Sequence, residues 1–178
     1  YLPATIISRC QQVALPTPQV AAAAQWLREQ GIANPELSLA QTGNAPLAAL
    51  ALDDGEFWTQ RKALLESLAA PKVNALMLAE QVREFPVGRL LGWLQRWTYD
   101  LLSARSGGKV RYNPDFETAL TRIAGSLRAA NLARYHRQLV RQQRSVNHPL
   151  NARLFIEELL LSYAALLRGE SMAGIYAG

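Results

Sequence analysis

The segment Val87-Gly-Arg-Leu-Leu-Gly-Trp-Leu-Gln-Arg-Trp-Thr-Tyr-Asp-Leu-Leu-Ser-Ala104 decides the fold class of this chain. Its large apolar side chains recur at helical spacing, at Leu90, Leu91, Trp93, Leu94, Trp97 and Leu101. This period places them on one broad face of a helix. Because a face so wide must be covered by other helices, the segment predicts the centre of a helical domain.

Start and stop signals predict helices through most of the remaining sequence. Proline after an asparagine or threonine is typical of a helix start, and glycine in the left-handed region is typical of a helix end. Helices are expected after Thr17, Asn34, Asn44, Asn113 and Asn147, over 56–70, 73–83 and 129–145, with stops at Gly31, Gly43, Gly125 and Gly169. Only Thr5 to Ile7 has the β-branched character of a strand. The expected fold class is all-α.

The helices divide into two groups. Three short helices over 17–54 form a small domain with a core of leucine, alanine and Trp26, and Asp53-Asp54-Gly55 marks its end. Residues 55–170 form a larger helical domain, preceded by 1–16 at the front of the chain and followed by a tail over 171–178.

Composition narrows the class of protein. Charged residues make up 19% of the chain, and no apolar run of 18 residues predicts a membrane span. One cysteine, Cys10, excludes an internal disulfide and fits a reducing cytoplasm. The net charge of +5 permits a nucleic-acid or acidic partner without requiring one.

The front of the chain carries the most specific motif. Leu2-Pro3-x-Thr5-Ile6-x-Ser8-Arg9-Cys10 resembles the Ser-Arg-Cys segment of clamp-loader subunits, which belong to the AAA+ class of ATPases. The resemblance implies that 1–16 is the end of an ATPase core. It also implies that Arg9, set between Ser8 and Cys10, is an arginine finger for the nucleotide of a neighbouring subunit, since guanidinium pairs bidentately with phosphate. A surface arginine in a turn is the alternative.

A second motif lies in the small domain, in Leu39-Ala-Gln-Thr-Gly43-Asn-Ala-Pro46-Leu47-Ala-Ala-Leu50. It is similar to the lid domain of clamp loaders. In members that hydrolyse ATP, the first turn of the helix here carries an arginine that senses nucleotide. Pro46 or Leu47 occupies that place, and an uncharged residue cannot hold a phosphate. The resemblance therefore implies a subunit that hydrolyses no ATP, and we expect no cofactor and no enzyme activity. Helix-cap chemistry at Gly43 holds in either case.

The third motif, Asn147 to Leu161, looks like the last helix of the clamp-loader collar domain. Apolar residues nearly encircle this helix, which indicates burial on most sides. The candidate interface residues, for contact with other subunits, are Leu150, Leu154, Glu157, Leu160 and Leu161. The centre of a monomeric helical bundle explains the same pattern.

A basic stripe of Arg134, Arg137, Arg141 and Arg144 follows one face of the preceding helix. It would suit DNA phosphates or an acidic partner, although no aromatic platform accompanies it in the sequence and a solvated helix face is the simpler explanation. His136, His148 and Cys10 lack the spacing of metal ligands, and no glycine-rich phosphate loop is present.

The resemblance implies a replication protein that functions as one subunit of a larger complex. Its partners would be the delta and gamma/tau subunits of the polymerase III clamp loader and, indirectly, the sliding clamp and primed DNA. Two alternatives stay open. One is an active gamma/tau-type ATPase of the same family, and the other is a nucleic-acid-binding module that uses the helix over 134–144.

Overall fold

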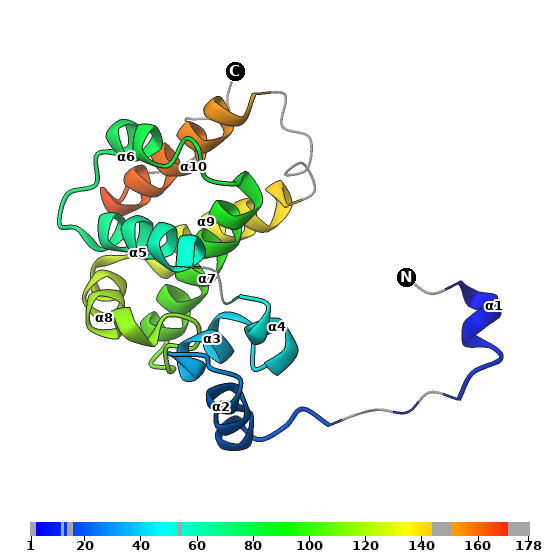
Figure 1. The fold of residues 1–178 in the computed structure, drawn as a ribbon. Coiled ribbons are helices and arrows are strands. Elements are labelled where there is room, and N and C mark those ends of the chain that lie inside the picture. The colour runs from blue at the N-terminus through cyan, green and yellow to red at the C-terminus, as the bar shows by residue number, and fades with distance from the viewer. Residues whose placement is uncertain (1–2, 12, 14–15, 53–54, 144–150, 171–178) are drawn as a thin grey trace.

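The structure, a computed structural model, describes residues 3–11, 13, 16–52, 55–143 and 151–170. Every regular element in these residues is a helix, which confirms the all-α prediction (Figure 1). Thr5 to Ile7, the segment with the β-branched character of a strand, is not a strand, because Ala4–Ile7 forms the helical turn α1. Its backbone makes local bonds, from Ile6 N to Pro3 O and from Arg9 N to Ile6 O. A strand needs a partner strand, whereas these local bonds need none.

The small unit consists of α2 (Val20–Glu29), α3 (Pro35–Gln41) and α4 (Pro46–Leu50). Its core is built mostly from alanine and leucine, namely Ala23, Ala24, Leu27, Ile32, Leu39 and Ala49, with Trp26 and Leu50 partly buried beside them. Gly31 and Gly43 take positive φ values of 89° and 65°, as predicted for helix ends. The predicted start at Thr17 is two residues early, since Gln19 is the N-cap and the first buried side chain is Ala23.

The large unit consists of α5 (Gly55–Ala69), α6 (Ala75–Gln81), α7 (Val87–Arg105), η1 (Pro114–Phe116), α8 (Glu117–Ser126), α9 (Ala129–Gln142) and α10 (Ala152–Leu167). Helix α7 packs against α8 and α9, and α10 packs against α6 and α9 (Figure 1). The predicted stop at Gly125 is wrong. Helix α8 continues to Ser126 and ends only where Leu127 turns extended and becomes buried.

The six large apolar residues predicted for the centre are all buried, and they lie on α7. A polar chain inside this core joins three helices. The indole Nε1 of Trp97 donates to Tyr163 Oη at 2.9 Å, and Tyr163 Oη donates to Leu68 O at 3.1 Å. Burial raises the pKa of Tyr163, so the hydroxyl stays neutral and keeps its proton to donate. The described helices include none long and apolar enough to cross a bilayer.

Helix α10 begins one residue after Asn151, whose side chain accepts a hydrogen bond from Leu154 N at 3.2 Å. Asparagine at this position satisfies one of the free backbone donors of the first turn. The predicted start after Asn147, the predicted end of the basic helix at Ser145 and the tail over 171–178 lie outside the described residues.

Candidate functional site

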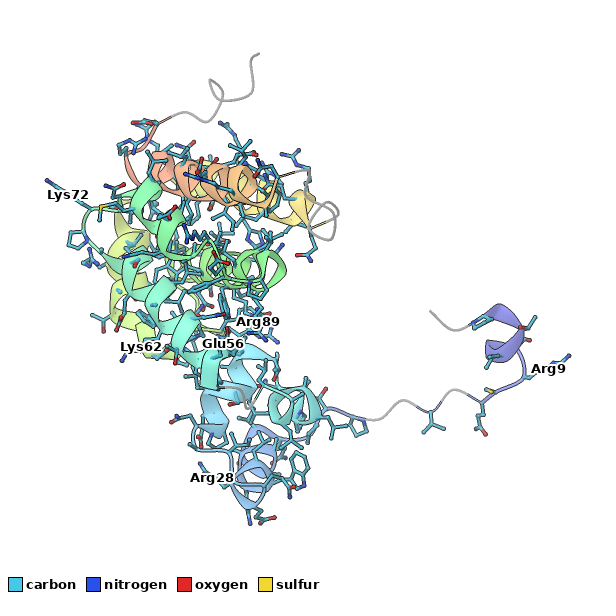
Figure 2. The ribbon with its side chains drawn as sticks, turned by 45° about the horizontal axis from the view of Figure 1, so that its top comes forward. Arg9, Arg28, Glu56, Lys62, Lys72 and Arg89 are labelled. Atoms are coloured by element: carbon cyan, nitrogen blue, oxygen red, sulfur yellow. The ribbon has the colours of Figure 1, made fainter. Side chains whose placement is uncertain are left out.

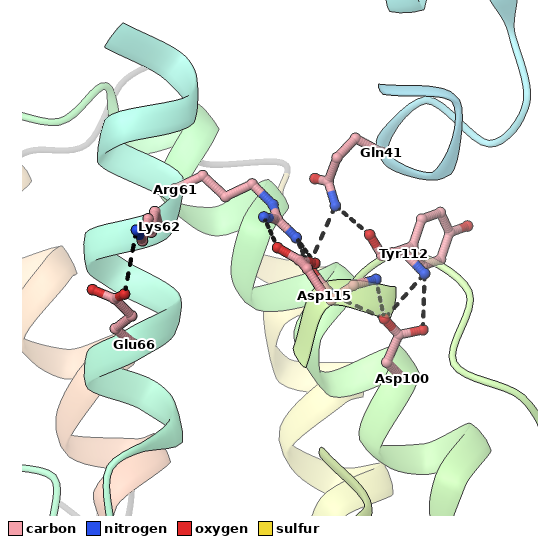
Figure 3. A network of polar contacts seen from close by, with 8 residues as sticks. Gln41, Arg61, Lys62, Glu66, Asp100, Tyr112 and Asp115 are labelled. Atoms are coloured by element: carbon pink, nitrogen blue, oxygen red, sulfur yellow. Dashed lines mark hydrogen bonds and ion pairs between the residues drawn. The ribbon is translucent and has the colours of Figure 1, made fainter. Parts of the chain in front are cut away.

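A buried polar network joins the small unit to the large one (Figure 3). Gln41, at the end of α3, donates through Nε2 to Tyr112 O and, at 3.3 Å, to Asn113 Oδ1. Arg61 of α5 donates to the same Asn113 Oδ1 at 2.9 Å and binds the Asp115 carboxylate bidentately, at 2.7 and 2.8 Å. The network therefore fixes the orientation of α3 relative to α5 and η1.

Asp100 anchors the loop that carries this network. Its side chain is fully buried on α7, and it accepts from the backbone N–H groups of Arg111, Tyr112 and Asn113 at 2.8 to 3.1 Å. It also accepts from Asn113 Nδ2 at 2.8 Å. A carboxylate with this many donors satisfies its charge inside the protein. Sequence reasoning missed Asp100, and the signal was an acidic residue among the buried positions of α7.

The residues of the predicted arginine finger lie on the N-terminal segment. Ser8, Arg9 and Cys10 are exposed, and Ser8 Oγ donates to Thr5 O at 3.2 Å. Figure 2 shows Arg9 away from the helical body of the chain. Its guanidinium is accessible to another molecule, and its role as a finger stays a prediction.

The lid-like segment forms α3, a turn and α4. Gly43 and Asn44 are both left-handed, with φ values of 65° and 68°, and they reverse the chain between the two helices. Pro46 is the first residue of α4, and Leu47 is 75% exposed in its first turn. The first turn of α4 therefore presents an apolar surface.

The candidate interface residues of α10 separate into three groups. Leu154 and Leu161 are 61% and 43% exposed, and Glu157 accepts from Arg153 Nε at 2.9 Å at the surface. The structure corrects the prediction for Leu160. This residue is fully buried in the core of the chain, because it lies on the side of α10 that faces the other helices. Leu150 lies outside the described residues.

Sequence reasoning missed two further apolar residues at the surface. Leu76 and Met77 are 59% and 63% exposed on α6, which packs against α10. Their exposure depends on how α6 is laid on α10, and helical spacing alone does not reveal it.

Arg134, Arg137 and Arg141 of the basic stripe are exposed along α9, while Leu132, Tyr135 and Leu139 bury the opposite face. Within the described part of the chain, none of the three has a carboxylate partner. Arg144 lies outside the described residues. The stripe is therefore available to an anionic partner.

His136 of α9 is half-buried. Its Nδ1 is 2.8 Å from Thr98 Oγ1, and burial lowers the pKa of the imidazole. In the described ranges, histidine, cysteine and acidic side chains do not gather in groups of three or more that would suit a metal ion.

The sequence of the chain, including most of the part that forms the large unit, is similar to sequences of known proteins. Residues 55–164, which span α5 to most of α10, match the family described as DNA polymerase III, delta subunit, C terminal. The chain is also 30% identical over 177 residues to DNA polymerase III subunit delta' of Pseudomonas aeruginosa, an alignment that covers 91% of this chain and 53% of that protein. The chain thus spans about half the length of this relative. By its match over most of the large helical unit, the chain belongs to the family of C-terminal domains of DNA polymerase III delta subunits.

Proposed function

We propose that this chain is the lid and collar part of a delta-prime-type clamp-loader subunit. In this role, 17–54 is the lid, 55–170 is the collar, and the residues before 17 continue from an ATPase core. The subunit assembles with delta and gamma/tau subunits in the cytoplasm and helps to load the sliding clamp on primed DNA. The observation that carries the proposal is the family match over α5 to α10, on a unit whose helices α6 and α10 expose large apolar side chains.

The exposed apolar residues of α10 support assembly through the collar. Leu154 and Leu161 lie seven residues apart, which places them two turns apart on the same side of the helix. Burying such side chains against a partner stabilises a complex by about 1.5 to 3 kcal/mol each. Leu160 faces the core of this chain and has no part in the interface.

Co-purification with gamma/tau subunits tests the assembly. We expect the chain to elute with gamma/tau collar domains in size-exclusion chromatography at micromolar concentration. Changing Leu154 and Leu161 together to aspartate removes the complex, because two desolvated carboxylates oppose the contact. Leu47→Asp, at a 75% exposed position on α4, is the matched control and leaves the complex intact. Separate elution of the wild-type chain contradicts the collar assignment.

Arg9 has a separate test in the complete clamp loader. Arg9→Ala in the full-length subunit is expected to lower the DNA-stimulated ATPase rate while the complex still assembles, because a finger stabilises charge on the transferred phosphoryl group. Arg28→Ala is the control, since Arg28 is an exposed arginine on α2 and pairs with Glu36. An unchanged ATPase rate in Arg9→Ala removes the finger role.

The uncharged first turn of α4 supports a subunit that does not hydrolyse ATP. The side chains of Pro46 and Leu47 carry no charge and no hydrogen-bond donor that could hold a phosphate. The opposing candidate, an active gamma/tau-type ATPase, requires a phosphate-binding lysine in the sequence before Tyr1. Reading that sequence in the full-length gene decides between the two.

A further inference from the structure

A groove runs along α7 where the small unit and α9 meet it. Two adjoining cavities form the groove, and they share Gly92, Gln95 and Arg96 as lining residues. The larger one, about 430 Å³, is closed on one side by the end of α3 and on the other by α9. The groove is therefore made by elements that are far apart in the sequence.

Glycine makes room along the floor of this groove. Gly88 and Gly92 lie four residues apart on α7 and both line the smaller cavity. A Cβ atom at Gly92 would lie 3.2 Å from Arg96 Nη1. The Arg96 guanidinium thus lies close to the backbone of α7 at Gly92, and a larger residue at position 92 would press against it.

Arg96 is the central charge of the groove. Its side chain is half-buried, and desolvation lowers its pKa despite an opposing contribution from Tyr112. Among the described residues it has neither a hydrogen-bond acceptor nor a carboxylate partner, and none of the residues lining the two cavities is acidic. A partly buried guanidinium with its donors free is well suited to bind phosphate or carboxylate oxygens.

Two aromatic side chains line the same cavity as the Arg96 guanidinium. Tyr99 and Tyr112 line the larger cavity, with ring centroids 5.2 Å apart in an edge-to-face arrangement. Tyr99 is 39% exposed, and the guanidinium of Arg111 lies 5.4 Å from the Tyr112 ring. The aromatic residue next to the basic stripe in the sequence, Tyr135, is buried in the core of the chain and does not accompany the arginines at the surface. The fold supplies two, because His136 and Val140 of α9 line the same cavity.

We propose that this groove binds single-stranded nucleic acid. Arg96 pairs with a phosphate, Tyr99 stacks on an unpaired base, and Arg137 and Arg141 continue the phosphate contacts along α9. Aromatic stacking together with backbone neutralisation is the usual chemistry of sequence-tolerant single-strand binding. An acidic peptide would use the arginines but would leave the exposed ring of Tyr99 without a role. The proposal concerns the chain by itself and stands independently of its place in a clamp loader.

Fluorescence anisotropy of the 178-residue chain with a labelled oligothymidylate of about 20 nucleotides tests the proposal. We expect saturable binding that weakens steeply with salt. Arg96→Gln weakens it about tenfold and lowers the salt slope by about 0.7, the value for one phosphate contact on a single strand. Tyr99→Ala weakens it about tenfold, while Tyr99→Phe keeps wild-type affinity because the ring remains.

Lys72→Gln is the matched control for charge. Lys72 lies between α5 and α6, it lines neither cavity of the groove, and its replacement removes the same unit charge. We expect its affinity and salt slope to equal those of the wild type. Circular dichroism spectra of all variants establish that each is folded.

Three results would each overturn the proposal. The first is no binding of the oligonucleotide at about 100 μM chain, the upper range of non-specific affinity. The second is binding that Lys72→Gln weakens as much as Arg96→Gln does, because the contact would then be general surface charge. The third is binding of a labelled glutamate-rich peptide, lost in Arg96→Gln, in place of the oligonucleotide, which would assign the groove to an acidic protein segment.

Discussion

The buried ion pair between α5 and η1, inside the large unit, gives the sharpest test of the polar network at the junction of the two units. The Arg61 side chain is 2% exposed and the Asp115 side chain is 33% exposed. The rings of Trp58 and Phe116 lie 5.8 and 5.9 Å from the guanidinium carbon of Arg61. The positive charge is thus enclosed by the protein, whereas the negative charge still reaches water.

This difference in exposure predicts that replacing Asp115 and replacing Arg61 lower the free energy of unfolding by different amounts. Asp115→Ala leaves a buried guanidinium without a carboxylate, and we expect the free energy of unfolding to fall by about 3 kcal/mol. Arg61→Met leaves a carboxylate that water can hydrate, and Asn113 Oδ1 keeps its bond from Gln41. We expect this change to cost about 1.5 kcal/mol. The double variant loses less than Asp115→Ala alone, because the stranded charge is removed with its partner.

Urea unfolding followed by circular dichroism measures these costs. With a slope near 2 kcal/mol per molar, a loss of 3 kcal/mol lowers the midpoint by about 1.5 M. Lys62→Ala is the control on the neighbouring residue, since Lys62 Nζ lies 3.9 Å from Glu66 Oε1 and both side chains are exposed (Figure 3). It is expected to cost less than about 0.5 kcal/mol. If Asp115→Ala lowers the free energy of unfolding no more than Arg61→Met does, or no more than Lys62→Ala does, the charge of Arg61 is not enclosed as the structure shows.

Three further predictions concern the large unit. Tyr163→Phe removes the acceptor of the buried Trp97 indole N–H and is expected to lower the free energy of unfolding by about 2 kcal/mol in urea titration; an unchanged midpoint contradicts the bond. Leu160→Ala is expected to cost about 2 to 5 kcal/mol and Leu154→Ala less than about 0.5, because the first is fully buried and the second 61% exposed; equal melting temperatures would contradict this burial. Since burial lowers the pKa of His136, the unfolded chain binds more protons below about pH 6.5, so stability falls on acidification to about pH 5.5 and the fall is smaller in His136→Gln; equal pH dependence in both would rule this out.

Much of the fold was predictable, because the apolar residues on the buried face of a helix recur every three or four residues in the sequence. The apolar face of α7 was read from Val87 to Ala104, and the turns at Gly31 and Gly43 were read from glycine alone. A helix boundary was predicted wrongly where a local stop signal, such as glycine, competed with the packing of a nearby side chain. Helix α8 passes through Gly125, since burial of Leu127 rather than the glycine sets its end.

The site was less predictable than the fold. Helical spacing grouped Leu154, Leu160 and Leu161 together, yet the structure buries only Leu160 completely and leaves the other two at the surface. Spacing gives the angle of a residue around its helix, but it does not say which side another helix will cover. Asp100 was missed for a related reason: its partners are backbone groups of a loop that begins after α7 has ended.

Most of the helices, their order, the two apolar cores and the family of the large unit could be predicted from the sequence, because each depends on short-range periodicity or on residue identity. Which distant segments come into contact could not be predicted in this way. Gln41 and Tyr112 are 71 residues apart and joined by a hydrogen bond. Arg96 and Tyr99 of α7 line one groove together with His136 of α9. Such meetings follow from how whole helices pack, a global compromise among all buried surfaces that no local stretch of sequence contains.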